Sequence, residues 1–124
     1  MLRNLLYVML GGAAGAGLRY LVTLLCGRWT PMQMPLATLL VNLTGCFLLG
    51  LLIGLGQRYI QVSQSLLLML SFGVCGAFTT FSTFTADAFR LLNAGAWGMM
   101  IAYMAISIVG GFSLFVLGRT IILH

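Results

Sequence analysis

Four long apolar segments, separated by three short polar breaks, run through the chain of 124 residues. A membrane-spanning helix needs roughly 20 mostly apolar residues, and each segment is about that long. The breaks contain turn-forming residues such as Pro31, Pro35 and Gly95, which end helices. The pattern therefore predicts an all-α membrane protein, one transmembrane domain over residues 1–124, with helices at about 4–26, 36–56, 66–90 and 97–118.

Composition supports a bilayer as the solvent of this chain. Hydrophobic residues make up 61% and charged residues only 6%, whereas about 25% of residues are charged in soluble proteins. The six basic residues, all Arg, are spread along the chain and form no basic run, so we expect no nucleic-acid partner. The N-terminus, with Arg3 before an apolar run, is also similar to a signal peptide, but the run continues to Cys26 and favours a first membrane helix.

The chain lacks the residue sets that enzymes use. Asp87 is the only acid, and the only histidine is the last residue, His124. There is no phosphate-binding loop, metal-ligand cluster or catalytic triad in the sequence. Three cysteines in apolar surroundings favour buried thiols over a zinc site or a disulfide framework. We therefore expect no enzymatic activity.

Charge and glycine spacing both bear on assembly. With four spans, Arg3, Arg58 and Arg119 lie on the side of both termini, against Arg28 and Arg90 on the other side. Orientation depends on this asymmetry, and so small a bias hints at insertion in both directions. Four short helices enclose little space, so a pore would form between subunits. The spacings Gly11-xxx-Gly15 and Gly50-xxx-Gly54 permit the close helix approach that such an assembly needs.

A run of hydroxyl and aromatic side chains in the third segment, residues 73–84, is the strongest functional signal. Polar groups at membrane depth are costly unless they face protein or a water-filled path. Ser and Thr can bend a helix, and with Gly73 and Gly76 nearby we predict that the third helix is broken near its centre. Carbonyls freed there could hold a cation. Phe78, Phe81 and Phe84 recur every third residue; they could pack in the core, or offer their positive ring edges to an anion.

Further candidates lie in the other three segments. Asn42 shares a helix face with Thr38 and could bind an ion through its amide or form an interhelical hydrogen bond. Arg19 could attract anions into a vestibule, reach the membrane interface, or pair with Asp87. Tyr103 and Ser107, one turn apart in the fourth segment, could extend a hydroxyl track or simply pack.

Residues 11–20, 38–47 and 73–84 together resemble the CrcB/Fluc family of fluoride channels, in order and spacing over nearly the whole chain. The resemblance implies a fluoride-selective channel in the inner (plasma) membrane, built as an antiparallel, dual-topology homodimer with two pores. It also implies a structural Na⁺ at the dimer centre, held by the backbone carbonyls of Gly76 and Thr79 from both subunits. Arg19 matches a vestibule arginine. The residues that would line each fluoride pore are Asn42, Phe81, Phe84, Thr38, Ser82, Thr83, Tyr103 and Ser107.

Two positions depart from the family pattern. Asp87 stands where members commonly carry Glu, so its role in ion movement stays open. Gly111 stands where a second fourth-helix serine is expected.

The main alternative is a small multidrug-resistance-type exporter, which also has four short helices. That class exchanges protons for cations at a membrane-embedded carboxylate, whereas Asp87 lies near the end of its segment. A purely structural membrane subunit would need neither the hydroxyl–phenylalanine run nor Asn42 in the middle of a span.

Overall fold

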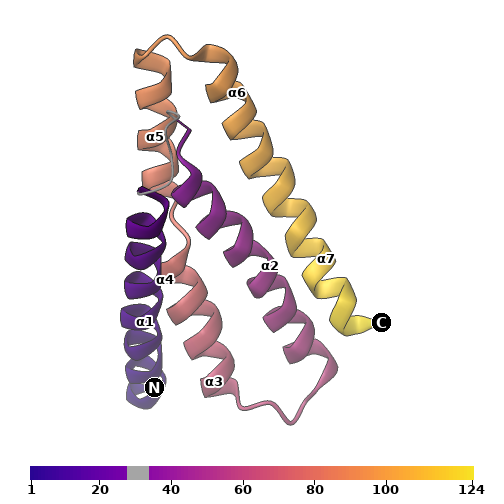
Figure 1. Cartoon of the computed structure of the whole chain (residues 1–124). Coiled ribbons are helices and arrows are strands. Elements are labelled where there is room, and N and C mark those ends of the chain that lie inside the picture. Colours follow the sequence, from indigo (N-terminus) through magenta and orange to yellow (C-terminus); the bar gives the residue numbers. More distant parts are fainter. Residues whose placement is uncertain (28–33) are drawn as a thin grey trace.

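The computed structural model describes residues 1–27 and 34–124, which fold as a bundle of helices (Figure 1). Four helices are long and apolar enough to cross a membrane: Leu2–Gly27, Leu36–Arg58, Gln64–Asn93 and Trp97–Leu123. The four predicted spans are therefore confirmed, with boundaries within five residues of the expected ones. Arg28 and Pro31 lie outside the described residues, so the charge count that used Arg28 stays a prediction.

The first two spans are single helices, and the last two are composite. α1 covers Leu2–Gly27 and α2 covers Leu36–Arg58. The third span consists of α3 (Gln64–Leu68), a π-helical stretch (Met69–Cys75), α4 (Gly76–Phe78) and α5 (Phe81–Asn93). The fourth consists of α6 (Trp97–Ala105), a second π-helical stretch (Ile106–Gly110) and α7 (Gly111–Leu123).

Helix α2 lies in the middle of the bundle and packs most extensively on α7. On its other side, α1 packs on the π-helical stretch and α4 of the third span. Both chain termini lie toward the end of the bundle where α2 turns into α3 (Figure 1). The central position of α2 lets it contact the third span and the fourth span at the same depth.

The third helix is broken at Thr79 and Thr80, as an extended connection between α4 and α5 (Figure 1). Thr79 has φ −78° and ψ 157°, and Thr80 has φ −153° and ψ 117°. The predicted break is confirmed at the hydroxyl residues, whereas the two glycines that were predicted to assist it lie outside it. Gly73 lies in the π-helical stretch, and Gly76 begins α4 with helical φ −63° and ψ −37°. The hydroxyl residues, not the glycines, interrupt the helix.

The glycines instead bring helix backbones together within one chain. A Cβ on Gly11 or Gly15 would clash with the backbone carbonyls of Met69 and Val74 in the third span. A Cβ on Gly50 would clash in the same way with the Phe115 carbonyl of α7. The close helix approach predicted from both GxxxG spacings is therefore confirmed, but at Gly11, Gly15 and Gly50 the close neighbour is a helix of the same chain rather than a second subunit.

The turn between α5 and α6 closes with a Schellman motif. The N–H of Ala96 donates to the Leu91 carbonyl and the N–H of Gly95 donates to the Leu92 carbonyl, each at 3.0 Å. Gly95 has φ 73°, the left-handed conformation that this motif requires and that glycine adopts without strain. Gly95, which the sequence predicted as a turn residue, therefore ends the third span at Asn93, three residues after the predicted end.

We predict that Gly50→Ala destabilises the protein, because the added methyl group must push α2 away from α7. Overpacking of this kind costs about 1–3 kcal/mol, so the thermal unfolding midpoint in detergent should fall. Gly12→Ala is the matched control, since a Cβ there meets nothing within 4 Å. An unchanged midpoint for Gly50→Ala would contradict the close packing of α2 on α7.

Candidate functional site

The face of α2 that meets the broken third helix carries two of the predicted site residues, Thr38 and Asn42, together with Gly45. Thr38, Asn42 and Gly45 are spaced by four and three positions and therefore share one side of the helix. Thr38 and Gly45 are buried and Asn42 is half-buried. Each one contacts a different part of the third span, and together they build the site.

Asn42 binds both backbone groups of Thr80, at the helix break. Its Oδ1 accepts from the Thr80 N–H at 2.7 Å, and its Nδ2 donates to the Thr80 carbonyl at 3.1 Å. The sequence analysis predicted an interhelical hydrogen bond as one role of Asn42, and the structure contains two such bonds. One N–H of the Asn42 amide remains as a donor, because an NH₂ group carries two hydrogens, so the anion-binding role stays a prediction.

Gly45 makes room for the other residue of the break. A Cβ at Gly45 would clash with Cγ2 of Thr79 and lie 3.5 Å from the Phe78 ring. The Thr79 hydroxyl donates to the Cys75 carbonyl at 2.9 Å, beside a 3.0 Å bond from the Thr79 N–H to the same carbonyl. The Thr79 side chain is therefore held between the end of α4 and the backbone of α2.

Thr80 also starts α5 as its N-cap. Its hydroxyl oxygen accepts from the Thr83 N–H at 3.3 Å, and its O–H donates to the Thr83 hydroxyl at 3.0 Å. The Ser82 hydroxyl lies 3.4 Å from the same Thr80 oxygen. N-terminal N–H groups of a helix need such partners, and Thr80 supplies one from inside the membrane span. Ser82 and Thr83 themselves stay exposed in the single chain.

Carbonyl oxygens become available where α4 ends. The last four carbonyls of a helix have no intrahelical partner, and at this point those are the carbonyls of residues 76–79. Among the described residues no group of three His, Cys, Asp or Glu side chains could hold a metal. Backbone carbonyls of unwound helices are groups that can coordinate Na⁺, so the sodium site predicted at Gly76 and Thr79 stays a prediction.

An aromatic row starts at the break and runs into the core. The ring centroids of Phe81 and Phe84 are 5.7 Å apart, and those of Phe84 and Tyr103 are 5.3 Å apart. Tyr103 is 0% exposed and Phe84 8% exposed, whereas Phe81 is 80% exposed. The row therefore joins a fully buried phenol to a ring that stands open on the surface of the single chain.

Two hydroxyls beside the aromatic row lack partners among the described residues. The Tyr103 hydroxyl and the Ser107 hydroxyl are buried without a hydrogen bond. A buried polar group without a partner is costly. Whether these two hydroxyls extend a hydroxyl track or simply pack stays a prediction.

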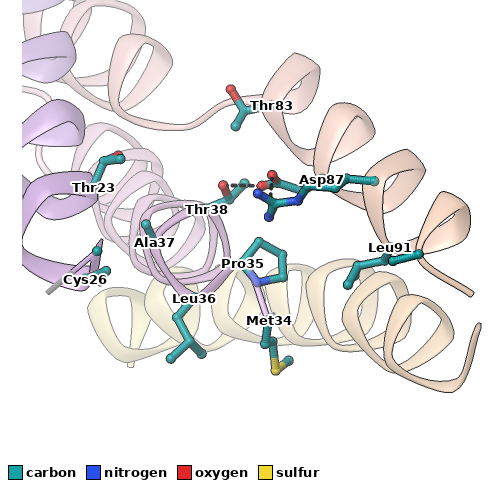
Figure 2. A pocket seen from close by; sticks show the side chains of 13 residues that line it. Thr23, Cys26, Met34, Pro35, Leu36, Ala37, Thr38, Thr83, Asp87 and Leu91 are labelled. Carbon is teal, nitrogen blue, oxygen red and sulfur yellow. Dashed lines mark hydrogen bonds and ion pairs between the residues drawn. The ribbon is translucent and has the colours of Figure 1, made fainter. Parts of the chain in front are cut away.

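Thr38 and Asp87 meet in a pocket of about 510 Å³ between α1, α2 and α5 (Figure 2). The Thr38 hydroxyl donates to Asp87 Oδ2 at 2.6 Å, and Asp87 Oδ1 pairs with the Arg90 guanidinium at 3.3 Å. Asp87 therefore pairs with Arg90 and not with Arg19, the partner considered in the sequence analysis. Arg90, three residues after Asp87 on the same helix, reaches the carboxylate without crossing between helices.

Arg19 lines a second, smaller pocket on α1. This pocket, of about 280 Å³, also contains Thr38, Thr80 and Thr83. Arg19 is half-buried, and the pocket brings it to the same hydroxyl cluster that caps α5. The arrangement is compatible with a positively charged entrance to the site, the vestibule role predicted for Arg19.

The structure adds two residues that the candidate set had left out. Thr80 is the residue through which α2 holds the break, and Gly45 is the residue that admits Thr79. A threonine before Phe81 is an N-cap signal, so the capping role of Thr80 could be predicted from the sequence, whereas its two bonds to Asn42, 38 positions away, could not. The role of Gly45 depends on contact with a residue 34 positions away and could not.

The chain is similar to known proteins over nearly its full length. The family described as "CrcB-like protein, Camphor Resistance (CrcB)" matches residues 6–119. A protein of Azobacteroides pseudotrichonymphae genomovar. CFP2 is 37% identical over 118 residues, 95% of this chain and 94% of its own. One from Chloroflexus aurantiacus (strain ATCC 29366 / DSM 635 / J-10-fl) is 40% identical over 117 residues, which cover 94% of this chain and 93% of its own. One from Rhodospirillum centenum (strain ATCC 51521 / SW) is 42% identical over 113 residues, which cover 89% of this chain and 90% of its own. All three are named "Fluoride-specific ion channel FluC".

We predict that Thr80→Val lowers the thermal unfolding midpoint, because it removes the cap of α5 while keeping the shape of the side chain. Loss of an N-cap costs about 1 kcal/mol. Thr80→Ser keeps the hydroxyl and should stay close to the wild type. Equal midpoints for Thr80→Val and the wild type would show that the hydroxyl does not hold the start of α5.

Proposed function

Because this chain belongs to the CrcB family of fluoride-specific ion channels, we propose that it conducts fluoride passively out of the cytoplasm. Ion channels are a non-enzyme class, which agrees with the expectation of no catalytic activity. The four apolar spans and the channel relatives indicate a multi-pass membrane protein, and we propose the plasma membrane as its location. Fluoride crosses membranes as neutral hydrofluoric acid and ionises inside. A negative-inside potential then drives the anion out, by about 2.3 kcal/mol per charge for each 100 mV.

The aromatic row and its flanking hydroxyls are the observation that supports this function. Phenyl rings carry positive edges, and uncharged hydroxyl and amide donors can replace part of an anion's water shell. The donors present are those of Asn42, Thr38, Ser82, Thr83, Tyr103 and Ser107. Such a lining binds an anion weakly enough to release it, which conduction requires.

We propose that two copies in opposite orientations complete two pores. Phe81, Ser82 and Thr83 are exposed in the single chain, so a lining that begins with them is open on one side. A second copy would cover that side and bring its own exposed aromatic residues to it. The antiparallel arrangement is favoured by the small bias of arginine between the two ends of the spans, which permits both orientations.

A structural Na⁺ fits the helix break. The carbonyls of Gly76 and Thr79 lie at the end of α4, Gly76 is exposed, and hard cations prefer oxygen ligands. One chain supplies too few oxygens to surround the ion, so the same carbonyls of a second copy would complete the shell at the dimer centre. The ion would hold the two breaks together and neutralise their carbonyl dipoles.

The alternative, a proton-coupled exporter of cationic drugs, gains no support from the site. Such an exporter needs a carboxylate that is free to exchange a proton and a cation. Asp87 is instead occupied by Thr38 and Arg90, and the matched relatives are named as fluoride channels.

We predict that Phe81→Ile and Phe84→Ile each reduce fluoride efflux from liposomes by at least about tenfold, which corresponds to about 1.4 kcal/mol in the barrier. The substitution keeps an apolar side chain and removes the positive ring edge. Phe112→Ile, at an exposed phenylalanine outside the row, is the control and should leave efflux unchanged. Size-exclusion chromatography should show an intact dimer for all three. Normal efflux with either ring replaced would contradict the proposed pore.

We also predict that Na⁺ stabilises the dimer specifically. A ligand that binds only the folded state at 100 times its Kd adds about 2.7 kcal/mol. The thermal unfolding midpoint should therefore be higher in sodium chloride than in N-methylglucamine chloride of equal ionic strength. Equal midpoints in the two salts would argue against a structural sodium ion.

A further inference from the structure

Asn42 and the helix break form a closed pair of hydrogen bonds. The side-chain oxygen of Asn42 accepts from the N–H of Thr80 at 2.7 Å, and its side-chain nitrogen donates to the carbonyl of the same residue at 3.1 Å. Thr80 is buried, at 8% exposure. One side chain of α2 thus satisfies the backbone donor and helps to satisfy the backbone acceptor at the point where the third helix opens.

This pair of bonds decides which groups stay free at the break. In an uninterrupted α-helix the Thr80 N–H would donate to the carbonyl four residues earlier, which is that of Gly76. Asn42 removes this donor from the helical ladder, and the Gly76 carbonyl loses its usual partner. Thr80 is buried, and a buried N–H without a partner is costly, so without Asn42 the Thr80 N–H would gain most by returning to the Gly76 carbonyl.

Gly45 holds the neighbouring residue from the same face of α2. A Cβ at Gly45 would clash with Cγ2 of Thr79, so the glycine leaves the space that the extended Thr79 occupies. Asn42 and Gly45 are three residues apart and contact consecutive residues of the break. The opening is thus fixed by α2 at two points and is not only a property of the third helix.

We infer that Asn42 is a positioning residue for the helix break, in addition to any contact with an anion. By holding Thr80 out of the helix it keeps the Gly76 carbonyl available to a cation. The Asn42 amide, which is assigned to the pore, and the Gly76 carbonyl, which is assigned to the cation site, are therefore alternative acceptors for the same N–H, that of Thr80. The part of this inference that concerns the cation rests on the proposed function, whereas the part that concerns the break does not.

The first readout is the backbone conformation of the break in lipid bilayers, measured from the ¹³C chemical shifts of Thr79 and Thr80 by solid-state NMR. Asn42→Leu removes both hydrogen bonds at similar volume, and we expect both threonines to shift from extended toward helical values. Asn42→Asp keeps an oxygen that accepts from the Thr80 N–H and should keep the extended shifts, which also covers the case in which the Leu variant does not fold. Extended shifts in Asn42→Leu, or helical shifts in Asn42→Asp, would overturn the inference.

The second readout is apparent sodium affinity, taken from a sodium titration of the thermal unfolding midpoint. We expect Asn42→Leu to weaken it by at least about tenfold, or about 1.4 kcal/mol, and Phe112→Ile to leave it unchanged because Phe112 is an exposed residue of α7, outside the break. Equal weakening in both variants would overturn the link between Asn42 and the cation. If the wild type itself shows no sodium response, the cation proposal fails, and the chemical shifts still decide the role of Asn42.

Discussion

Backbone groups at membrane depth must find their partners inside the protein, because the bilayer core offers none. This constraint acts most strongly at Thr79 and Thr80, where the third helix opens into an extended connection. The opening is possible because Asn42 supplies a donor and an acceptor to Thr80 and because the Thr80 hydroxyl caps α5. The carbonyls left over by this arrangement are the groups that would hold the proposed sodium ion.

The rest of the bundle places α2 where it can meet this need. Gly50 lets α2 approach the backbone of α7, while Gly11 and Gly15 let α1 approach the third span. Close packing on both sides leaves one face of α2, with Thr38, Asn42 and Gly45, directed at the break. An uncharged lining results, in which Asp87 is already engaged by Thr38 and Arg90.

The spans could be predicted from the sequence because their cause is local: about twenty apolar residues define a helix that crosses the bilayer. The presence of a break could also be predicted, since consecutive hydroxyl residues signal an interruption, but its support by Asn42 of α2 is not local. The position of the break within the third span could not be predicted from Gly73 and Gly76, since glycine serves close packing as readily as it serves a bend. Deciding between the two needs the partner helix: Gly73 lies against Gly11 of α1. The ion pair of Asp87 was also not predicted, because the sequence analysis considered Arg19 of α1, whereas Asp87 pairs with Arg90, three residues later on the same helix.

Fluoride release from liposomes that contain the purified protein, followed with a fluoride electrode and repeated with chloride, tests the central claim most directly. The account predicts rapid fluoride loss under a potential and no measurable chloride loss, because a narrow lining of ring edges and hydroxyls suits a small anion. Retention of fluoride by liposomes that contain a correctly folded dimer, or equal loss of the two anions, would contradict it.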